Sequence, residues 1–143
     1  VFDLVNRPLQ GTSKPDASLD VLEPGVPATI AGQEVTPLEV PHGRMRVFGY
    51  RIGPIGYVTD AKEIPPAAEA ILTGVKVLVL NALFRKVHPT HLSLSEAVAT
   101  AQRIGAERTF LTHLTHRISH AELEAELPNG VRPAFDGLQV TVD

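Results

Sequence analysis

Residues 75–113 read VKVLVLNALFRKVHPTHLSLSEAVATAQRIGAERTFLTH and predict a strand, a helix and a second strand in succession. The first six residues form a nearly continuous apolar run, which is typical of a strand covered on both faces. Ser93 and Glu96 have the spacing of a capping box and predict a helix that ends near Ile104. The residues RTFL at 108–111 then predict a short strand. This order of elements favours an α/β layer architecture.

Upstream of this unit, the sequence predicts two hairpins and a short helix. Apolar residues partly alternate over residues 26–40 across a turn at Gly32-Gln33, which indicates two strands. Residues 44–59 are rich in β-branched and aromatic side chains and are divided by Gly53-Pro54, so they predict a second hairpin. Pro65-Pro66 then begins a short helix, because proline is tolerated in the first helical turn.

Downstream of the unit, the sequence predicts one more helix and the last strands. Ser119 is the expected N-cap of a helix that runs to about Leu127. Residues 131–142 predict two final strands around a turn at Asp136-Gly137. Hairpins followed by alternating strands and helices are the pattern of one sheet with helices packed on it.

The chain is expected to have two parts. Residues 1–25 are rich in proline, glycine and serine and show little periodicity, so they predict a loop-rich, disordered lead-in. Residues 26–143 contain all of the predicted strands and helices and are expected to form one domain.

Composition excludes several classes of protein. The chain has 143 residues, a net charge of −3 and no cysteine. The basic residues are scattered, which argues against binding to duplex nucleic acid. No run approaches the roughly 20 apolar residues of a membrane-spanning helix, so we expect a cytoplasmic protein with no membrane partner. Without cysteine, any metal must be held by imidazole and carboxylate groups.

Four residues with metal-binding side chains lie where the predicted strands give way to loops: His42, Asp60, His91 and His113. Three of them follow a predicted strand, and a single sheet could bring these three to one edge. His91 differs, because it lies two residues before the expected N-cap at Ser93. Hydrolases use neutral imidazoles and carboxylates around an open metal position, where bound water loses its proton near neutral pH.

Simpler readings of the same residues stay open at this point. A single histidine after a strand is common at a protein surface, and an aspartate there often belongs to a turn. His88 is expected to be a solvent-facing loop residue, and His116 and His120 to be part of a surface cluster. No phosphate-binding glycine loop and no GxSxG nucleophile motif occur in the sequence.

Three segments, read in order, resemble a known family. They are EVPHGRMRVFGYRIGPIGYVTDAKEIP (39–65), LVLNALFRKVHPTHLSLSEAVATAQRIGAERTFLTHLTHRISH (78–120) and AFDGLQV (134–140). Over residues 26–143 they resemble the C-terminal half of the metallo-β-lactamase superfamily. The phosphodiesterase branch is the most similar, with its carbon-phosphorus lyase phosphodiesterases and, more distantly, tRNA 3′-processing nucleases. The resemblance implies one half of an α/β-β/α sandwich that carries two divalent metal ions, zinc or manganese, at the edge of its sheets.

The resemblance also implies a role for each of the four residues. His42 in VPHG would bind one metal, Asp60 in YVTD would bridge both, and His113 in FLTH would bind the other. His91 in HPTHLSL would act as a general acid or contact the phosphate. The family's HxHxDH motif, which supplies most of the other ligands, does not occur in these 143 residues.

From that absence we expect the chain to be a fragment of a dinuclear hydrolase. By itself it would be inactive, would bind metal weakly or not at all, and would leave one sheet face exposed, which could favour a homodimer. A phosphodiesterase acting on a small phosphodiester or nucleotide-like substrate is the first hypothesis. A thioester or lactone hydrolase and a non-catalytic binding module are the alternatives.

Overall fold

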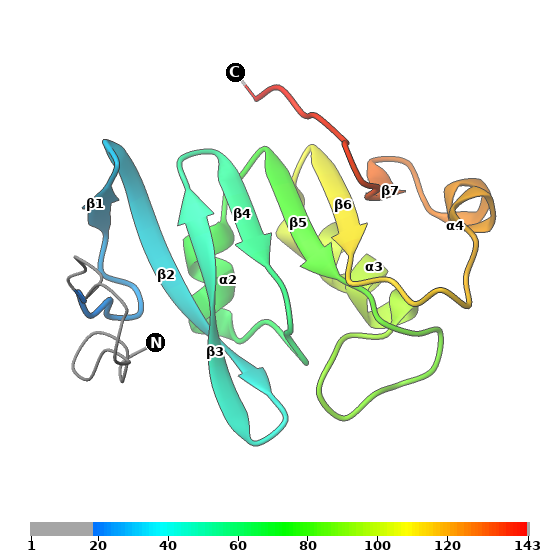
Figure 1. The fold of residues 1–143 in the computed structure, drawn as a ribbon, viewed down its shortest axis with the longest axis horizontal. Coiled ribbons are helices and arrows are strands. Elements are labelled where there is room, and N and C mark those ends of the chain that lie inside the picture. Colours follow the sequence, from blue (N-terminus) through cyan, green and yellow to red (C-terminus); the bar gives the residue numbers. More distant parts are fainter. Residues whose placement is uncertain (1–18, 143) are drawn as a thin grey trace, which may run out of the picture.

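The computed structural model describes residues 19–142, which form a seven-stranded sheet with its strands in sequence order (Figure 1). The strands are β1 (Ala28–Ile30), β2 (Gln33–His42), β3 (Met45–Ile52), β4 (Ile55–Val58), β5 (Val77–Asn81), β6 (Arg108–Thr112) and β7 (Val131–Pro133). The helices are α2 (Pro66–Leu72), α3 (Leu94–Ile104) and α4 (His120–Glu126). The predicted α/β fold is confirmed. The lead-in predicted for residues 1–25 lies mostly outside the described residues.

The sequence predicts the turn between β1 and β2 and the turn between β3 and β4, while the structure adds a third tight connection, between β2 and β3. β1 to β4 pair antiparallel, each with the next. From β4 onward the neighbours are parallel, with α2, α3 and α4 in the connections. Because two antiparallel steps separate β2 from β4, these strands run in the same direction. The carboxyl ends of β2, β4, β5 and β6 therefore share one edge of the sheet.

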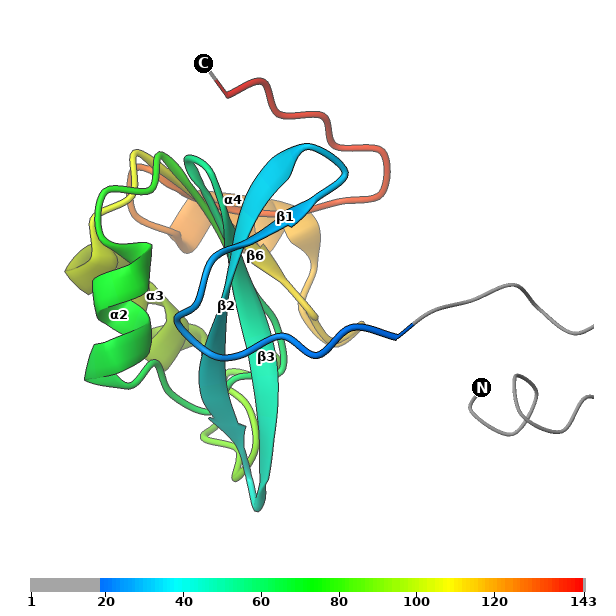
Figure 2. The same ribbon diagram turned by 90° about the vertical axis from the view of Figure 1, so that its left-hand side faces the viewer.

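The hydrophobic core lies between the sheet and the helices α2 and α3, which lie on the same side of it (Figure 2). Alternate residues of the strands face these helices, as Leu78 and Leu80 do in β5. Helix α2 packs so close to β4 that a Cβ added at Gly56 would lie 2.6 Å from Leu72 Cδ2. None of the helices in residues 19–142 has the length and apolar character that a membrane span requires.

The other sheet face was expected to be exposed, and the structure corrects this in part. Tyr57 in β4 is 46% exposed, but Phe110 in β6 is only 9% exposed and Val77 in β5 is 3% exposed. The C-terminal segment lies close to Phe110, since residues 138–140 line a pocket together with it. This segment covers the part of the face near β6.

The prediction of two strands in residues 131–142 is wrong for the second strand, because residues 134–142 contain no strand. The backbone N–H of Ala134 donates to Leu111 in β6, so the preceding Pro133 faces the outer edge, where it has no N–H to donate. The carbonyl of Thr141 accepts instead from the Arg108 side chain at 2.7 Å. The segment is therefore held by a side chain rather than by a strand partner.

Helix α3 begins with the capping box that the sequence predicts. Ser93 N–H donates to Glu96 Oε2 at 2.8 Å, and Glu96 N–H donates to Ser93 Oγ at 3.4 Å. The Glu96 carboxylate also accepts from Lys62 Nζ at 2.8 Å. Burial alone would raise the pKa of Glu96, but the hydrogen bonds from Lys62 and Ser93 outweigh it and hold the pKa below its ordinary value.

We predict that Glu96→Gln lowers the free energy of unfolding by about 1 kcal/mol at pH 7, the usual size of a capping contribution. A carboxyl whose pKa is depressed by folding stabilises the protein above its unfolded pKa, and this stabilisation is lost as pH falls through the folded pKa. The difference from the wild type, measured by chemical denaturation, should therefore shrink on acidification. Glu122→Gln, in the exposed capping box of α4, is the matched control. A difference that persists at acidic pH would contradict the role of the carboxylate.

Candidate metal centre

Four side chains come together at the edge where the carboxyl ends of β2, β4 and β6 meet. His42 ends β2, Asp60 lies two residues after β4, His113 directly follows β6, and His91 belongs to the loop before α3. Nε2 of His91 lies 3.1 Å from Asp60 Oδ1, and Nε2 of His113 lies 3.7 Å from the same oxygen. The His91 ring centroid is 4.6 Å from that of His42 and 4.7 Å from that of His113.

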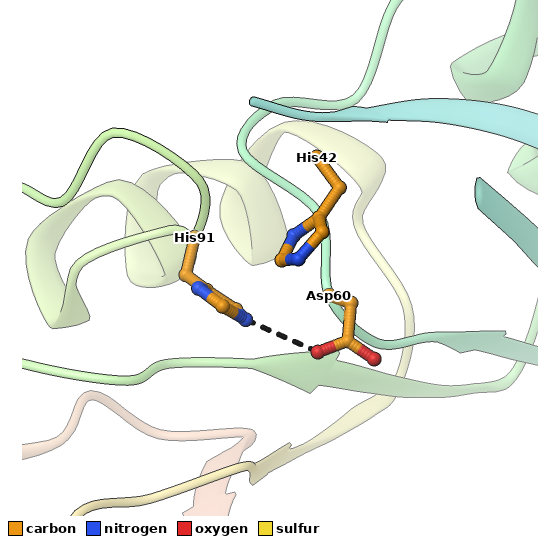
Figure 3. Close-up of side chains that lie close together, drawn as sticks. All are labelled: His42, Asp60 and His91. Atoms are coloured by element: carbon orange, nitrogen blue, oxygen red, sulfur yellow. Dashed lines mark hydrogen bonds and ion pairs between the residues drawn. The ribbon is translucent and has the colours of Figure 1, made fainter. Parts of the chain in front are cut away.

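A smaller group within these four is compact enough to share one ion. One donor atom each from His42, Asp60 and His91 lie within 4.8 Å of one another, and the three side chains point toward a common centre (Figure 3). Donors at about 2.1 Å from a single zinc ion lie roughly 3.4 Å apart in a tetrahedral site. Small side-chain rotations would therefore be enough to bring these three donors to bonding distance.

Main-chain hydrogen bonds hold together the loops that carry these residues. The Lys62 N–H donates to the carbonyl of Pro41, at 2.8 Å, and ties the loop after β4 to the end of β2. The Leu92 N–H donates to the carbonyl of Ala61, also at 2.8 Å, and ties the loop before α3 to the same place. The spacing of His42, Asp60 and His91 is thus set by backbone contacts.

The side chain of Asn81, at the end of β5, anchors this arrangement. Its Oδ1 accepts from the Ala61 N–H at 2.9 Å, and its Nδ2 donates to the Ala61 carbonyl at 3.1 Å. Asn81 is fully buried. The sequence analysis did not identify this residue, although a polar side chain that ends an apolar run of six residues is a signal of such a role.

Thr90 orients both neighbouring imidazoles. A carbonyl oxygen can only accept, so His42 Nδ1 carries a proton and donates to the Thr90 carbonyl at 3.1 Å, which leaves Nε2 of the neutral ring with a free lone pair. The Thr90 hydroxyl lies 2.8 Å from His91 Nδ1. A Cβ at Gly43, whose φ is +63°, would lie 2.8 Å from Thr90 Cγ2, so the chain after His42 must approach Thr90 closely.

The pKa of His91 lies below its ordinary value. Its burial, with only 8% of the residue exposed, lowers its pKa below the ordinary value. The hydrogen bond to Asp60 acts in the opposite direction, and the neighbouring imidazoles of His113 and His42 lower the pKa further. A neutral imidazole is the form that binds a metal ion.

The donor set fits a divalent metal ion. It combines imidazole nitrogens with one carboxylate, which suits zinc, manganese or iron rather than calcium. The side chains of Asp60 and His113 are each 43% exposed, so the cluster is open to an incoming ligand. The cluster can therefore bind a metal. His91 belongs to the compact group, whereas the resemblance implies a catalytic or phosphate-binding role for it.

The other histidines divide into two groups. His88 was expected to face solvent, but it is half-buried and its Nδ1 lies 3.0 Å from the Thr90 hydroxyl. The same hydroxyl lies 2.8 Å from His91 Nδ1, so it is within hydrogen-bonding distance of both imidazoles. His116 and His120 are exposed and lie outside the cluster, and the His120 ring packs against Phe135 instead, with 5.6 Å between the ring centroids.

Comparison with known proteins gives the family. A family model described as the β-lactamase superfamily domain matches residues 2–114. A protein of Porphyromonas gingivalis (strain ATCC BAA-308 / W83) named octanoyltransferase is 35% identical over 142 residues, which is 96% of this chain and 28% of that protein. The chain thus spans little more than a quarter of this curated relative.

Solved structures agree with the family match. The crystal structure of a diphosphatase from the PhnP family is 36% identical, with a TM-score of 0.80 over 83% of this chain and 47% of that one. Human tRNase Z, short form, is 18% identical, with a TM-score of 0.62 over 78% of this chain and 42% of that one, and shows the fold alone. The restriction of the resemblance to a C-terminal half stays a prediction. The sequence match, the sheet and the cluster at its edge together place this chain in the metallo-β-lactamase superfamily.

Proposed function

We propose that this chain contributes part of the metal site of a hydrolase that cleaves small phosphodiester or diphosphate substrates with the help of zinc or manganese. The observation that carries the proposal is the convergence of imidazoles on the Asp60 carboxylate. Oδ1 of Asp60 lies 3.7 Å from His113 Nε2 and 3.1 Å from His91 Nε2. Donor atoms of His42, Asp60 and His91 lie within 4.8 Å of one another. The similarity to a diphosphatase, at 36% identity, supports the choice of a phosphorus centre.

In this proposal three of the four residues bind the metal and the fourth acts on the substrate. Asp60, His42 and His113 hold the metal, which when bound acts as a Lewis acid and activates water. Asp60 has two carboxylate oxygens and can serve two ions, as the family resemblance implies. His91 holds the phosphate or gives a proton to the departing oxygen, and the Thr90 hydroxyl at its Nδ1 fixes the plane of its ring.

Acyl chemistry is the second candidate, because the relative from Porphyromonas gingivalis is named octanoyltransferase. A thioester hydrolase on the same fold would use the same metal-binding residues. The larger part of that relative lies outside the match, since the aligned region is 28% of it. The name can therefore describe another part of that protein, and we rank phosphodiester hydrolysis first.

Backbone strain at two of the four residues supports a functional site. Asp60 and His113 both have a φ of +58°, in the left-handed region that L-residues with a side chain seldom occupy. Ala31, in the β1–β2 turn, is the remaining non-glycine residue with positive φ among those described. Strain of this kind persists where the surroundings enforce it and is concentrated at functional sites.

We predict that His113→Gly is more stable than His113→Ala by about 1 kcal/mol in metal-free protein, because only glycine adopts this φ without steric cost. Both variants should bind zinc more weakly, since both lose the imidazole. Chemical denaturation and zinc titration measure the two effects. The same pair of changes at His116, where φ is not positive, should show no gain for glycine. Unchanged zinc affinity would remove His113 from the ligand set.

We predict that the complete protein containing this sequence hydrolyses bis(4-nitrophenyl) phosphate in a metal-dependent manner. Chelation should abolish the activity, and added zinc or manganese should restore it. Asp60→Asn should lose bound metal and activity together, because it removes the carboxylate on which the imidazoles converge. Metal-dependent hydrolysis of an octanoyl thioester without any phosphodiesterase activity would instead favour acyl chemistry.

We predict that His91→Ala lowers the turnover of the complete enzyme by about 10²–10⁴-fold, the usual contribution of a general acid, while metal content stays unchanged. The effect should be largest on substrates with a poor leaving group, which most need the proton. Metal analysis of the purified variant separates the two roles of His91, because loss of metal would identify it as a ligand. His120→Ala removes an exposed imidazole outside the cluster and is the control.

A further inference from the structure

A pocket of about 410 Å³ lies beside the candidate metal centre, between the loop that follows β5 and the loop that follows β6. Phe84, Val87 and Ile118 provide apolar surface within it. Arg85, Lys86 and Arg117 add three cationic side chains, and no acidic residue is among those that line it. Pockets that hold small organic ligands have volumes of roughly 300–1,000 Å³, so this one is large enough for such a ligand.

His88 connects the pocket to the metal centre. It lines the pocket, and its ring centroid lies 5.4 Å from that of His91 and 5.6 Å from that of Phe84. Its Nδ1 reaches the Thr90 hydroxyl, which in turn contacts His91 Nδ1. A molecule in the pocket would therefore lie one side chain away from the residue that we propose to act on the leaving oxygen.

The charges of the pocket favour an anion. Arg85 is paired with Glu126 through two contacts of 2.8 Å, so its charge is largely compensated. The side chains of Lys86 and Arg117 are exposed and form no ion pair within residues 19–142. The pocket thus combines two cations that have no ion-pair partner among the described residues, Lys86 and Arg117, with apolar surface. This combination suits a ligand that has both a phosphate and a ring with apolar faces.

We propose that this pocket binds the leaving half of the substrate, an organic phosphate that also carries an aromatic ring system, as a nucleoside monophosphate does. The assignment to the leaving half rests on the proposed function of the metal centre. It deepens that function, because it selects substrates whose leaving group is itself an organic phosphate over simple diesters. The apolar surface contacts the ring, and Lys86 and Arg117 contact the phosphate.

The test measures binding of three probes to the complete protein: AMP, adenosine and inorganic phosphate. AMP should bind more tightly than either of the other two, because only AMP uses both kinds of surface. Lys86→Ala and Arg117→Ala should each weaken AMP binding by about three- to tenfold, the value of one lost charge-assisted contact at an exposed site. Binding of inorganic phosphate, which is free to lie at the metal, should change by less than about twofold. Arg132→Ala removes an exposed cation from β7 and should change neither.

Two results would overturn the proposal: AMP affinity that is unchanged in both variants, or an equal loss for AMP and inorganic phosphate. Amide shifts at Val87 and Ile118 on addition of AMP provide a second measurement, and their absence would also count against the pocket. The binding test needs no turnover, so it separates the two proposals. If AMP binds as expected but no phosphodiester is hydrolysed, the proposed function fails while the ligand class stands. If hydrolysis occurs but the variants bind AMP normally, only the pocket assignment fails.

Discussion

The candidate metal centre depends on one buried amide. Asn81, at the end of β5, forms hydrogen bonds with both backbone groups of Ala61, and Ala61 directly follows Asp60. The Ala61 carbonyl also accepts from the N–H of Leu92, in the loop that carries His91. The N–H of Lys62, the residue after Ala61, donates to the carbonyl of Pro41, beside His42 at the end of β2. Because Asn81 is fully buried, loss of either bond would leave a polar group unsatisfied, at a cost of about 1–3 kcal/mol. This cost opposes any movement of the loop away from the centre.

Sheet topology brings the loops close, and backbone conformation turns the side chains toward one another. Two antiparallel steps between β2 and β4 bring the end of β2 to the edge where the parallel strands end. The chain bends just beyond these strands at Asp60 and at His113, and both residues have a left-handed backbone conformation. The Ala82 N–H donates to the carbonyl of Thr112 at 2.9 Å and holds the second of these bends against β5. The strain is local, whereas the contacts that offset it come from neighbouring strands.

How much the sequence could predict depended on how local each signal was. The α3 capping box lies within four residues, and the apolar run of β5 is continuous, so both elements were predicted correctly. The prediction of a second C-terminal strand was wrong because Pro133 has no N–H to donate at the outer edge of β7. Which edge of β7 is the outer one depends on its pairing with β6, and the sequence does not show that pairing. Thr90 and Asn81 were missed for a related reason. Their hydrogen bonds join residues 48 and 20 positions apart, so a pattern within one short segment does not identify their partners.

The electrostatics of this edge explain why a metal centre and a cationic pocket can serve one substrate. Asp60 supplies the carboxylate of the cluster, and burial lowers the pKa of the neighbouring His91 below its ordinary value. A phosphate held there depends on the metal ion for its neutralisation. A second phosphate farther from the ion needs cations from the protein itself, and Lys86 and Arg117 are the cations of the adjoining pocket that form no ion pair within residues 19–142. The half-buried His88 lies between the metal centre and the pocket, since it lines the pocket and its ring lies 5.4 Å from that of His91.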